Sequence, residues 1–325
     1  PLLTETAYAA AEAAGAERPF ATFDQVMDDY RARLQRYMPE GDPQDNPITF
    51  PFFAASIEDC LTHASTTGAR YNLYGSILSQ VGDTADGLAA IQKLIYEDKK
   101  LAWSEFVDAL HVDYEGYEGL RQMVRNRAPK YGNDDDRVDA LVKEITEGFC
   151  DGVHGIADDN DQANLMGPGF KRAAGLMCFG IHQKAHLPAS PDGRKQGDMT
   201  ANSFSPAVGM DRCGPTAVLR SVAKVDLTKA SHGSVLDLAL HDSVLRGEDA
   251  LEKLNALVRS FLQMGCTATL QLNILDRETL LRAQANPDAP EYRNLIVRVW
   301  GFSAVFVELP RGLQEHVLAR TEHGM

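Results

Sequence analysis

Strand-like and helical segments alternate over residues 234–323, and this pattern constrains the fold more than any other feature of the sequence. Strand-like runs at 234–240 and 267–275 are each followed by an amphipathic segment, at 249–265 and 276–287. A helix between two strands returns the chain so that the strands lie parallel in one sheet. The pattern therefore predicts an α/β architecture with mostly parallel pairing.

Helical spacing also dominates the first part of the chain. Apolar residues recur at helical intervals over 23–38, where the hydroxyl of Thr22 can accept from the free amides of the first turn. The segments 51–65 and 84–100 also predict helices, and a glycine-rich connector, 68–83, lies between them.

Two acidic runs, at 134–136 and 158–164, raise the question of a metal site. The first follows a turn with proline and glycine and leads into an amphipathic helix, for which we predict Asn133 or Asp134 as the cap. Carboxylates at a helix start usually act as caps and as partners of the helix dipole. The second run lacks the glycine and the terminal glutamate of a calcium loop. We therefore expect both runs to be solvated and predict no metal ion.

The composition excludes several classes of partner. The chain has 325 residues, of which 44% are hydrophobic, enough for one large domain or two smaller ones. Its net charge of −14 disfavours binding to nucleic acid and to anionic membranes. The sequence also contains no apolar run long enough to span a bilayer.

The cysteines are dispersed and form no metal-binding pattern. There are five, at widely separated positions: Cys60, Cys150, Cys178, Cys213 and Cys266. An odd and scattered set predicts reduced thiols that pack as small apolar side chains, and hence a cytoplasmic protein.

The character of the sequence changes at residue 187. Residues 187–227 are dense in Gly, Pro, Asp and Ser and end in an apolar run. We predict a long ordered loop followed by a strand and a helix, because long loops on rigid α/β scaffolds often carry function.

Gly301 stands in the middle of the most hydrophobic segment, "RNLIVRVWGFSAVFVELPRG" at 293–312. Most of this segment reads as a buried strand, in which a glycine loses side-chain packing. One interpretation is a bulge, a tight bend or a close backbone approach. The other applies to glycine alone: its α-carbon can flatten after losing a hydrogen atom, and the flanking amide and carbonyl delocalise the unpaired electron.

Several motifs, in order along the chain, resemble the C-terminal part of glycyl radical enzymes. "RVWGFSAVFVEL" followed by "LQEHVLARTEH" resembles the family signature around the radical glycine. Further stretches match the family in order and spacing: "LAAIQKLIYEDKK", "APKYGNDDD", "SPDGRKQGD", "SPAVGMDRCGPTAVLRSVAK" and "LQLNILDRETLLRAQ". The resemblance extends from about residue 20 onward.

The resemblance implies a fold and a division of the chain. The family fold is a ten-stranded α/β barrel of two five-stranded halves, entered by one loop with the radical glycine and one with a cysteine. We expect this chain to form the second half, with residues 1–190 as barrel and 191–325 as glycine radical domain. We also expect the segment 192–224 to pack around the glycine loop, with Asp192 and Arg194 joined by a charge-assisted hydrogen bond.

The same resemblance assigns the site. It implies that Gly301 holds the radical, which a separate radical-SAM activating enzyme installs, and that the protein binds no other cofactor. The neighbours of the glycine in this loop are Arg298, Val299, Trp300, Phe302 and Ser303. Further implied partners are a small-molecule substrate and, for the complete enzyme, a second copy in a homodimer.

The sequence departs from the family pattern in two respects. It contains neither the Gly-Cys-Val-Glu-like motif nor the Cys-Cys pair that carries the thiyl cysteine, and it starts at Pro1. We expect an incomplete chain that does not turn over substrate alone. Cys266 precedes a predicted strand and is expected to be a packed thiol. Trp300 stands where small residues often precede the radical glycine.

The motifs favour one reaction class within the family. "GPTAVLRSVAK" and "LQLNILD" resemble the lyase and dehydratase branch, which implies radical cleavage of a C–O, C–N or C–S bond. Arylacetate decarboxylation, fumarate addition and acyl transfer of the formate C-acetyltransferase type stay open. Two non-enzymatic alternatives are a spare part that replaces a damaged radical domain and a structural α/β domain.

Overall fold

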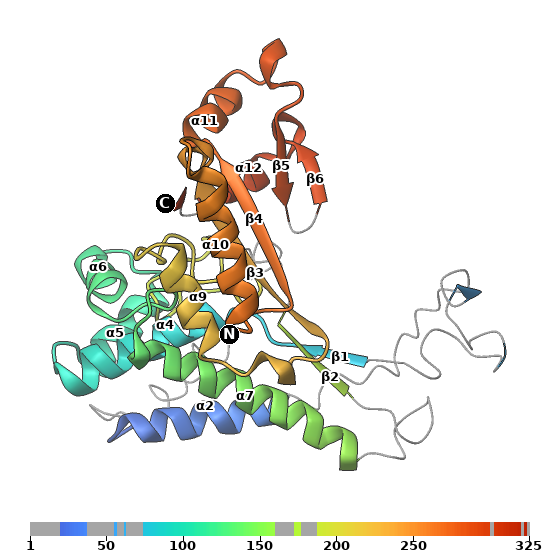
Figure 1. Ribbon diagram of the computed structural model, residues 1–325. Coiled ribbons are helices and arrows are strands. Elements are labelled where there is room, and N and C mark those ends of the chain that lie inside the picture. The colour runs from blue at the N-terminus through green and yellow to red at the C-terminus, as the bar shows by residue number, and fades with distance from the viewer. Residues whose placement is uncertain are drawn as a thin grey trace.

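Figure 1 shows a computed structural model of the chain. The structure describes residues 20–37, 55–56, 62, 74–159, 172–176, 187–299, 302–319 and 322–323. The predicted helix over 51–65 and the acidic run at 158–164 lie mostly outside these residues.

A parallel sheet organises the fold (Figure 1). Its strands β1 (Tyr74–Ile77), β2 (Arg172–Leu176), β3 (Gly233–His241) and β4 (Thr269–Leu275) lie side by side in this order, and each runs parallel to its neighbours. A short strand β7 (Glu322–His323) also pairs with β3 in parallel. The α/β architecture with parallel pairing is therefore confirmed.

Two of these strands differ from the sequence prediction. β1 lies inside the segment 68–83 that we predicted as a connector, and this prediction was wrong. β2 was not predicted at all. Both are short, and their register, with Tyr74 opposite Arg172, is set by pairing with each other rather than by an alternation that the sequence displays.

Helices surround the sheet and supply most of the core. In chain order they are α2 (Phe23–Tyr37), α4 (Val81–Ile91), α5 (Trp103–His111), α6 (Glu118–Arg127), α7 (Asp136–Asp159), α9 (Pro215–Ala223), α10 (Ala250–Gln263), α11 (Arg277–Ala285) and α12 (Arg311–Leu318). The shorter helical turns are the π-helix η3 (Gln92–Glu97) and the 3₁₀ turns η4 (Leu227–Lys229), η5 (Asp242–Leu245), η6 (Pro290–Tyr292) and η7 (Phe306–Glu308). Among the described helices, none combines the length and the apolar composition that a bilayer span requires.

The principal hydrophobic core forms where α7 packs. This helix contacts α4, α2 and β2, and buried side chains from all of these elements join one cluster. The hydroxyl of Thr22 accepts from the backbone N–H of Gln25 at 3.4 Å, so the cap predicted for α2 is confirmed. The predicted helices at 84–100, 249–265 and 276–287 correspond to α4 with η3, to α10 and to α11.

The turn before α7 is capped differently from our prediction. Asp135 is the capping residue, because its carboxylate accepts from the backbone N–H of Arg137 at 3.1 Å. Asn133 instead joins two loops: its side-chain oxygen accepts from the backbone N–H of Arg212 at 2.7 Å.

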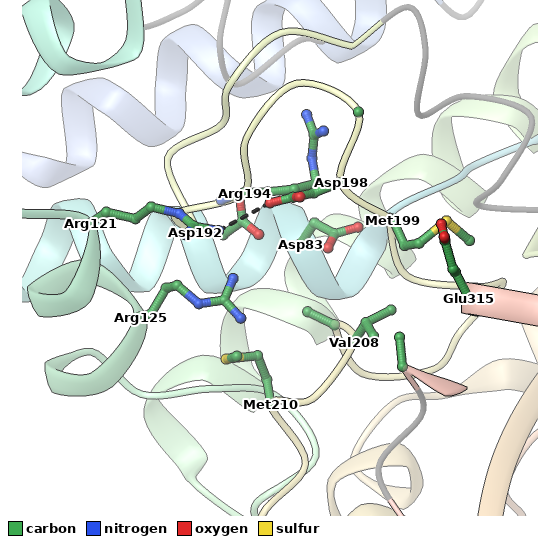
Figure 2. Close-up of a pocket in the computed structure, with 13 residues that line it drawn as sticks. Asp83, Arg121, Arg125, Asp192, Arg194, Asp198, Met199, Val208, Met210 and Glu315 are labelled. Atoms are coloured by element: carbon green, nitrogen blue, oxygen red, sulfur yellow. Dashed lines mark hydrogen bonds and ion pairs between the residues drawn. The ribbon is translucent and has the colours of Figure 1, made fainter. Parts of the chain in front are cut away.

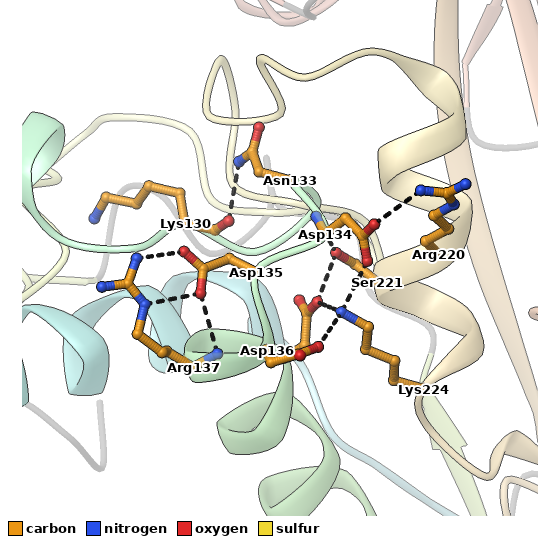
Figure 3. A network of polar contacts seen from close by, with 10 residues as sticks. Lys130, Asn133, Asp134, Asp135, Asp136, Arg137, Arg220, Ser221 and Lys224 are labelled. Carbon is orange, nitrogen blue, oxygen red and sulfur yellow. Dashed lines mark hydrogen bonds and ion pairs between the residues drawn. The ribbon is translucent and has the colours of Figure 1, made fainter.

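The acidic run binds a lysine (Figure 3). The ammonium of Lys224, just after α9, lies 2.9 Å from Asp134, 2.6 Å from Asp136 and 2.7 Å from the buried Asp139. Burial lowers the pKa of Lys224, but its hydrogen bonds to these carboxylates raise the pKa by more than burial lowers it, so the net shift is upward. The run thus fixes α9 to the start of α7. Among the described residues, no cluster of His, Cys, Asp or Glu has the arrangement of a metal site.

The C-terminal segment does not form the single strand that we predicted for 293–312. Two antiparallel strands, β5 (Ile296–Val299) and β6 (Phe302–Val305), pair with each other and are followed by η7 and α12. They lie beyond the end of β4 (Figure 1). Within the stretch "LQEHVLARTEH", α12 ends at Leu318, and Glu322 and His323 form β7.

Candidate functional site

Gly301 is flanked by paired strands. Val299 at the end of β5 lies opposite Phe302 at the start of β6. Trp300 and Gly301, which join these residues in the sequence, lie outside the described residues. The glycine is thus placed between two strands that run in opposite directions, rather than within one strand.

β5, the strand that precedes Gly301, presents one buried and one exposed face. Val297 and Val299 are buried, whereas Ile296 and Arg298 are exposed. The guanidinium of Arg298 donates to the hydroxyl of Ser303 across the pair at 3.2 Å. Of the predicted loop neighbours, the structure therefore brings Arg298 next to Ser303 and Val299 next to Phe302.

A small hydrophobic cluster supports these strands. It joins Val297 and Val299 to Phe306 and to buried side chains of β3, α11 and α12. Phe306 is fully buried and the amide of Gln314 in α12 donates to its carbonyl at 3.2 Å. α12, which follows Gly301 in the sequence, is thus bound to Phe306 of η7 and shares a buried cluster with β5.

The loop of residues 187–214 also contacts α12. Asn202 in this loop and His316 in α12 lie with their side-chain nitrogens 2.9 Å apart, and both side chains are buried. Asn202 also donates to Asp237 of β3 at 3.3 Å. The expected packing of 192–224 around Gly301 stays a prediction, but this loop does contact the helix that follows the glycine.

Hydrogen bonds within the 187–214 loop hold its conformation. Asp192 accepts from the hydroxyl of Ser190 at 2.5 Å and from the backbone N–H of Arg194 at 3.5 Å. The guanidinium of Arg194 donates to the carbonyls of Pro188 and Lys195. The charge-assisted hydrogen bond that we predicted between Asp192 and Arg194 was wrong, because the backbone N–H of Arg194 is the donor to Asp192 and its guanidinium donates to carbonyl oxygens instead.

A cavity of about 370 Å³ lies between this loop, α4, α6 and α12 (Figure 2). Charged side chains of both signs line it: Arg121, Arg125, Arg194, Asp83, Asp192, Asp198 and Glu315. Arg121 donates to the carbonyl of Gly193 at 2.7 Å and forms an ion pair with Asp198 at 3.0 Å. Polar side chains thus converge beside the end of α12.

Two buried carboxyl groups of α4 were not predicted from the sequence. Burial raises the pKa of Asp86 to about 7, although Lys130 and the backbone N–H of Tyr131 lower it. Burial and the nearby Asp192 raise the pKa of Asp83 well above its ordinary value. The available signal was a pair of aspartates three positions apart in a segment of small and apolar residues.

The cysteines that the structure describes are structural or peripheral. Cys266 is buried just before β4, as predicted, and burial raises the pKa of its thiol to about 11. Cys150 is also buried, with its pKa raised to about 11, and Cys213 is exposed. Cys266 is therefore a protonated, packed thiol at neutral pH.

Two family models match the chain. The model described as pyruvate formate lyase-like matches residues 10–167, and the model described as glycine radical matches residues 200–307. The second range includes Gly301, β5 and β6.

Several similar proteins are named as dehydratases. The probable dehydratase YbiW of Escherichia coli strain K12 is 32% identical over 94% of this chain and 39% of its own length. The trans-4-hydroxy-L-proline dehydratase of Clostridioides difficile is 31% identical over 95% of this chain and 39% of its own. The glycerol-bound structure of the B12-independent glycerol dehydratase from Clostridium butyricum superimposes with a TM-score of 0.85 at 30% identity, over 100% of this chain and 42% of that one.

These matches agree with the fold and with the collinear motifs. The chain spans about two fifths of the length of the relatives that it matches, and its parallel sheet corresponds to part of their barrel. The chain therefore belongs to the glycyl radical enzyme family and corresponds to the C-terminal part of its members.

Proposed function

We propose that Gly301 stores the radical of a glycyl radical enzyme whose reaction is a lyase or dehydratase elimination on a small molecule. The observation that carries this proposal is the match of the glycine radical model over 200–307, which contains Gly301. The described strands add support, because Val299 and Phe302 pair directly on either side of Trp300 and Gly301.

The chemistry assigned to Gly301 is hydrogen-atom transfer. A radical-SAM activating enzyme, as the proposed partner, takes one hydrogen atom from the α-carbon, so the C–H bond breaks and the unpaired electron stays on carbon. In each turnover this carbon takes the hydrogen atom from a cysteine thiol of the complete enzyme, and the resulting thiyl radical attacks the substrate. The hydrogen atom returns to sulfur when the product forms, so the radical is regenerated.

The packing around the strands suits storage of a radical. Val297 and Val299 are buried against Phe306, so the inner side of the pair is apolar. Water and dioxygen reach a site of this kind slowly while the segment stays docked. Cys266 does not fit the role of the thiyl cysteine, because it packs in the main core with its sulfur 3.6 Å from the carbonyl oxygen of Leu219.

Elimination is the reaction class that we propose, because the named relatives are dehydratases. We assign residues 1–190 to the barrel and 191–325 to the glycine radical domain, and we propose a cytoplasmic homodimer for the complete enzyme. The substrate is a small molecule with a leaving group next to the carbon that loses hydrogen.

Electron paramagnetic resonance tests the assignment. The full-length protein, activated without oxygen by its activating enzyme, should give a doublet, because the one α-hydrogen left on a glycyl radical splits the signal. Gly301→Ala should abolish the doublet. Gly119→Ala is the control, since Gly119 is exposed in α6 and an added methyl group there meets nothing within 4 Å. A doublet of normal size in Gly301→Ala would exclude Gly301.

A further inference from the structure

Two buried polar side chains of α12 hold the C-terminal segment, and they reach in opposite directions. The name C-terminal segment stands for residues 296–299 and 302–319. Gln314 donates to the carbonyls of Phe306 and Leu309, both within the segment, at 3.2 and 3.0 Å. His316 reaches out of the segment to Asn202 in the 187–214 loop, at 2.9 Å. Gln314 therefore keeps the segment together, whereas His316 attaches it to the rest of the molecule.

Asp237 determines how the Asn202 amide is oriented. The carboxylate of Asp237, in β3, lies 3.3 Å from the side-chain nitrogen of Asn202. A carboxylate can only accept, so the NH₂ group of Asn202 faces Asp237 and the carbonyl oxygen faces away. The second hydrogen of the same NH₂ group then points at Nε2 of His316. This nitrogen must be the acceptor, which places the ring proton on Nδ1.

Few atoms can replace this contact if it is lost. His316 is 1% exposed and Asn202 is 6% exposed, so water has little access to either side chain. A buried donor that loses its acceptor bears the desolvation cost of its polar group without compensation, so losing this contact destabilises the docked position of α12.

We propose that Asn202 and His316 are positioning residues, whose single hydrogen bond docks the C-terminal segment onto the 187–214 loop. The chemistry required at position 316 is an acceptor where Nε2 lies, and Asn202 supplies the donor. Other contacts join the segment to its surroundings, since Arg277 of α11 donates to the carbonyl of Leu318 at 3.2 Å. The contact between Asn202 and His316 is a buried side-chain link from α12 to this loop.

The consequence for Gly301 rests on the proposed function. When the hydrogen bond is intact, the C-terminal segment, whose two strands flank Gly301 in the sequence, is held closed. When it is broken, the segment opens more often, so an activating enzyme gains access to Gly301 more readily. Dioxygen gains the same access, and the stored radical is lost sooner.

Hydrogen exchange in protein that was never activated tests the proposal, and the outcome does not depend on any radical. His316→Leu keeps the site apolar and close in volume but removes the acceptor, so amides of α12 should exchange faster by on the order of tenfold, the factor that about 1.4 kcal/mol produces. His316→Gln places an oxygen near the Nε2 position and should retain most of the protection. Asn202→Leu should resemble His316→Leu.

A double-mutant cycle completes the test. If the two side chains act through one hydrogen bond, Asn202→Leu combined with His316→Leu should cost clearly less than the sum of the single changes. Full additivity would overturn the proposal. So would protection in His316→Leu that equals the wild type, or a loss in His316→Gln as large as in His316→Leu. Parallel loss of protection in α7 would overturn it as well, because His316 would then support the whole fold.

Discussion

The core around α7 and the C-terminal segment differ in how they hold charge and apolar surface. The core joins α2, α4, α7 and the sheet in one extensive cluster, and it also encloses the carboxyl groups of Asp86 and Asp139. The C-terminal segment shares a cluster of eight buried side chains with β3 and α11. Its carboxylates, Glu308 and Glu315, are exposed. The core is large and its elements pack against one another, whereas the C-terminal segment is small and packs against its neighbours.

This difference implies that the two regions open at different free energies. A two-stranded antiparallel pair such as β5 and β6 is at best marginally stable alone. Elements with few buried contacts open locally at lower free energy than the core does. A segment that stores a radical needs this property, because it must be closed during storage and accessible during installation. The predictions below test the contrast between the two regions.

The largest expected effect is cleavage of the chain by dioxygen at Gly301, between the two strands of the C-terminal segment, with no cleavage in the core. A carbon radical combines with dioxygen, and the peroxyl species then breaks the backbone at that residue. Activated full-length enzyme exposed to air should therefore release a piece that begins around Gly301 and contains α12. Mass spectrometry of the products measures the cleavage position.

Two controls belong with this experiment. Protein never activated should stay intact in the same air, and activated Gly301→Ala should also stay intact. Cleavage within the core, or equal cleavage without activation, would show that the radical does not reside on Gly301. Faster cleavage in His316→Leu than in the wild type would link the docking contact to protection of the radical.

The next effect concerns pH and should act on the core. Burial raises the pKa of Asp86 to about 7, so the folded protein keeps a proton there that the unfolded chain loses near pH 4. The stability from this group is complete below about pH 4 and is lost as the pH rises through about 7. A rise of about three units corresponds to at most about 4 kcal/mol.

Asp86→Asn isolates this contribution. The asparagine oxygen can still accept from the backbone N–H of Tyr131, which lies 2.7 Å from Asp86. The free energy of unfolding of the wild type, measured by urea denaturation, should fall more steeply between pH 5 and pH 8 than that of the variant. Equal slopes in the two proteins would contradict the shift at Asp86.

The elements of the core could be predicted from sequence because their signals are local. α2 and α10 show apolar residues at helical spacing, and Thr22 precedes α2 as a cap. β1 and β2 could not be predicted, because short strands become strands by pairing with each other. In the segment 293–312 a continuous apolar run indicates burial, but it does not show where the chain reverses.

The site was predicted only as far as motifs reach. Gly301 and its neighbours follow from a recognisable signature, whereas Asn202 and His316 carry no local sign of burial. Their environment is made by segments distant in sequence: Asn202 and His316 are 114 positions apart. The cap at Asp135 was missed by one residue, because Asn133 and Asp134, both good caps, were recruited by Arg212 and Lys224 instead.

The smallest of these effects concerns Lys224 and should also act on the core. Asp139 is fully buried, and its carboxylate depends on Lys224 at 2.7 Å and on the hydroxyl of Ser221 at 3.0 Å. Lys224→Met keeps the length of the side chain but leaves the carboxylate without its cation, at a cost of about 2–3 kcal/mol, below the roughly 3–5 kcal/mol of a fully buried pair because the Lys224 side chain is 30% exposed. Urea denaturation should show this loss, and hydrogen exchange should rise in α7.

Asp136→Ala is the matched control, because Asp136 contacts the same ammonium but its side chain is 91% exposed, and such pairs contribute about 0–1 kcal/mol. If the two variants lose the same stability, the buried carboxylate does not distinguish the core from the surface. If Lys224→Met instead affects α12 and leaves α7 unchanged, the contrast between the two regions is wrong.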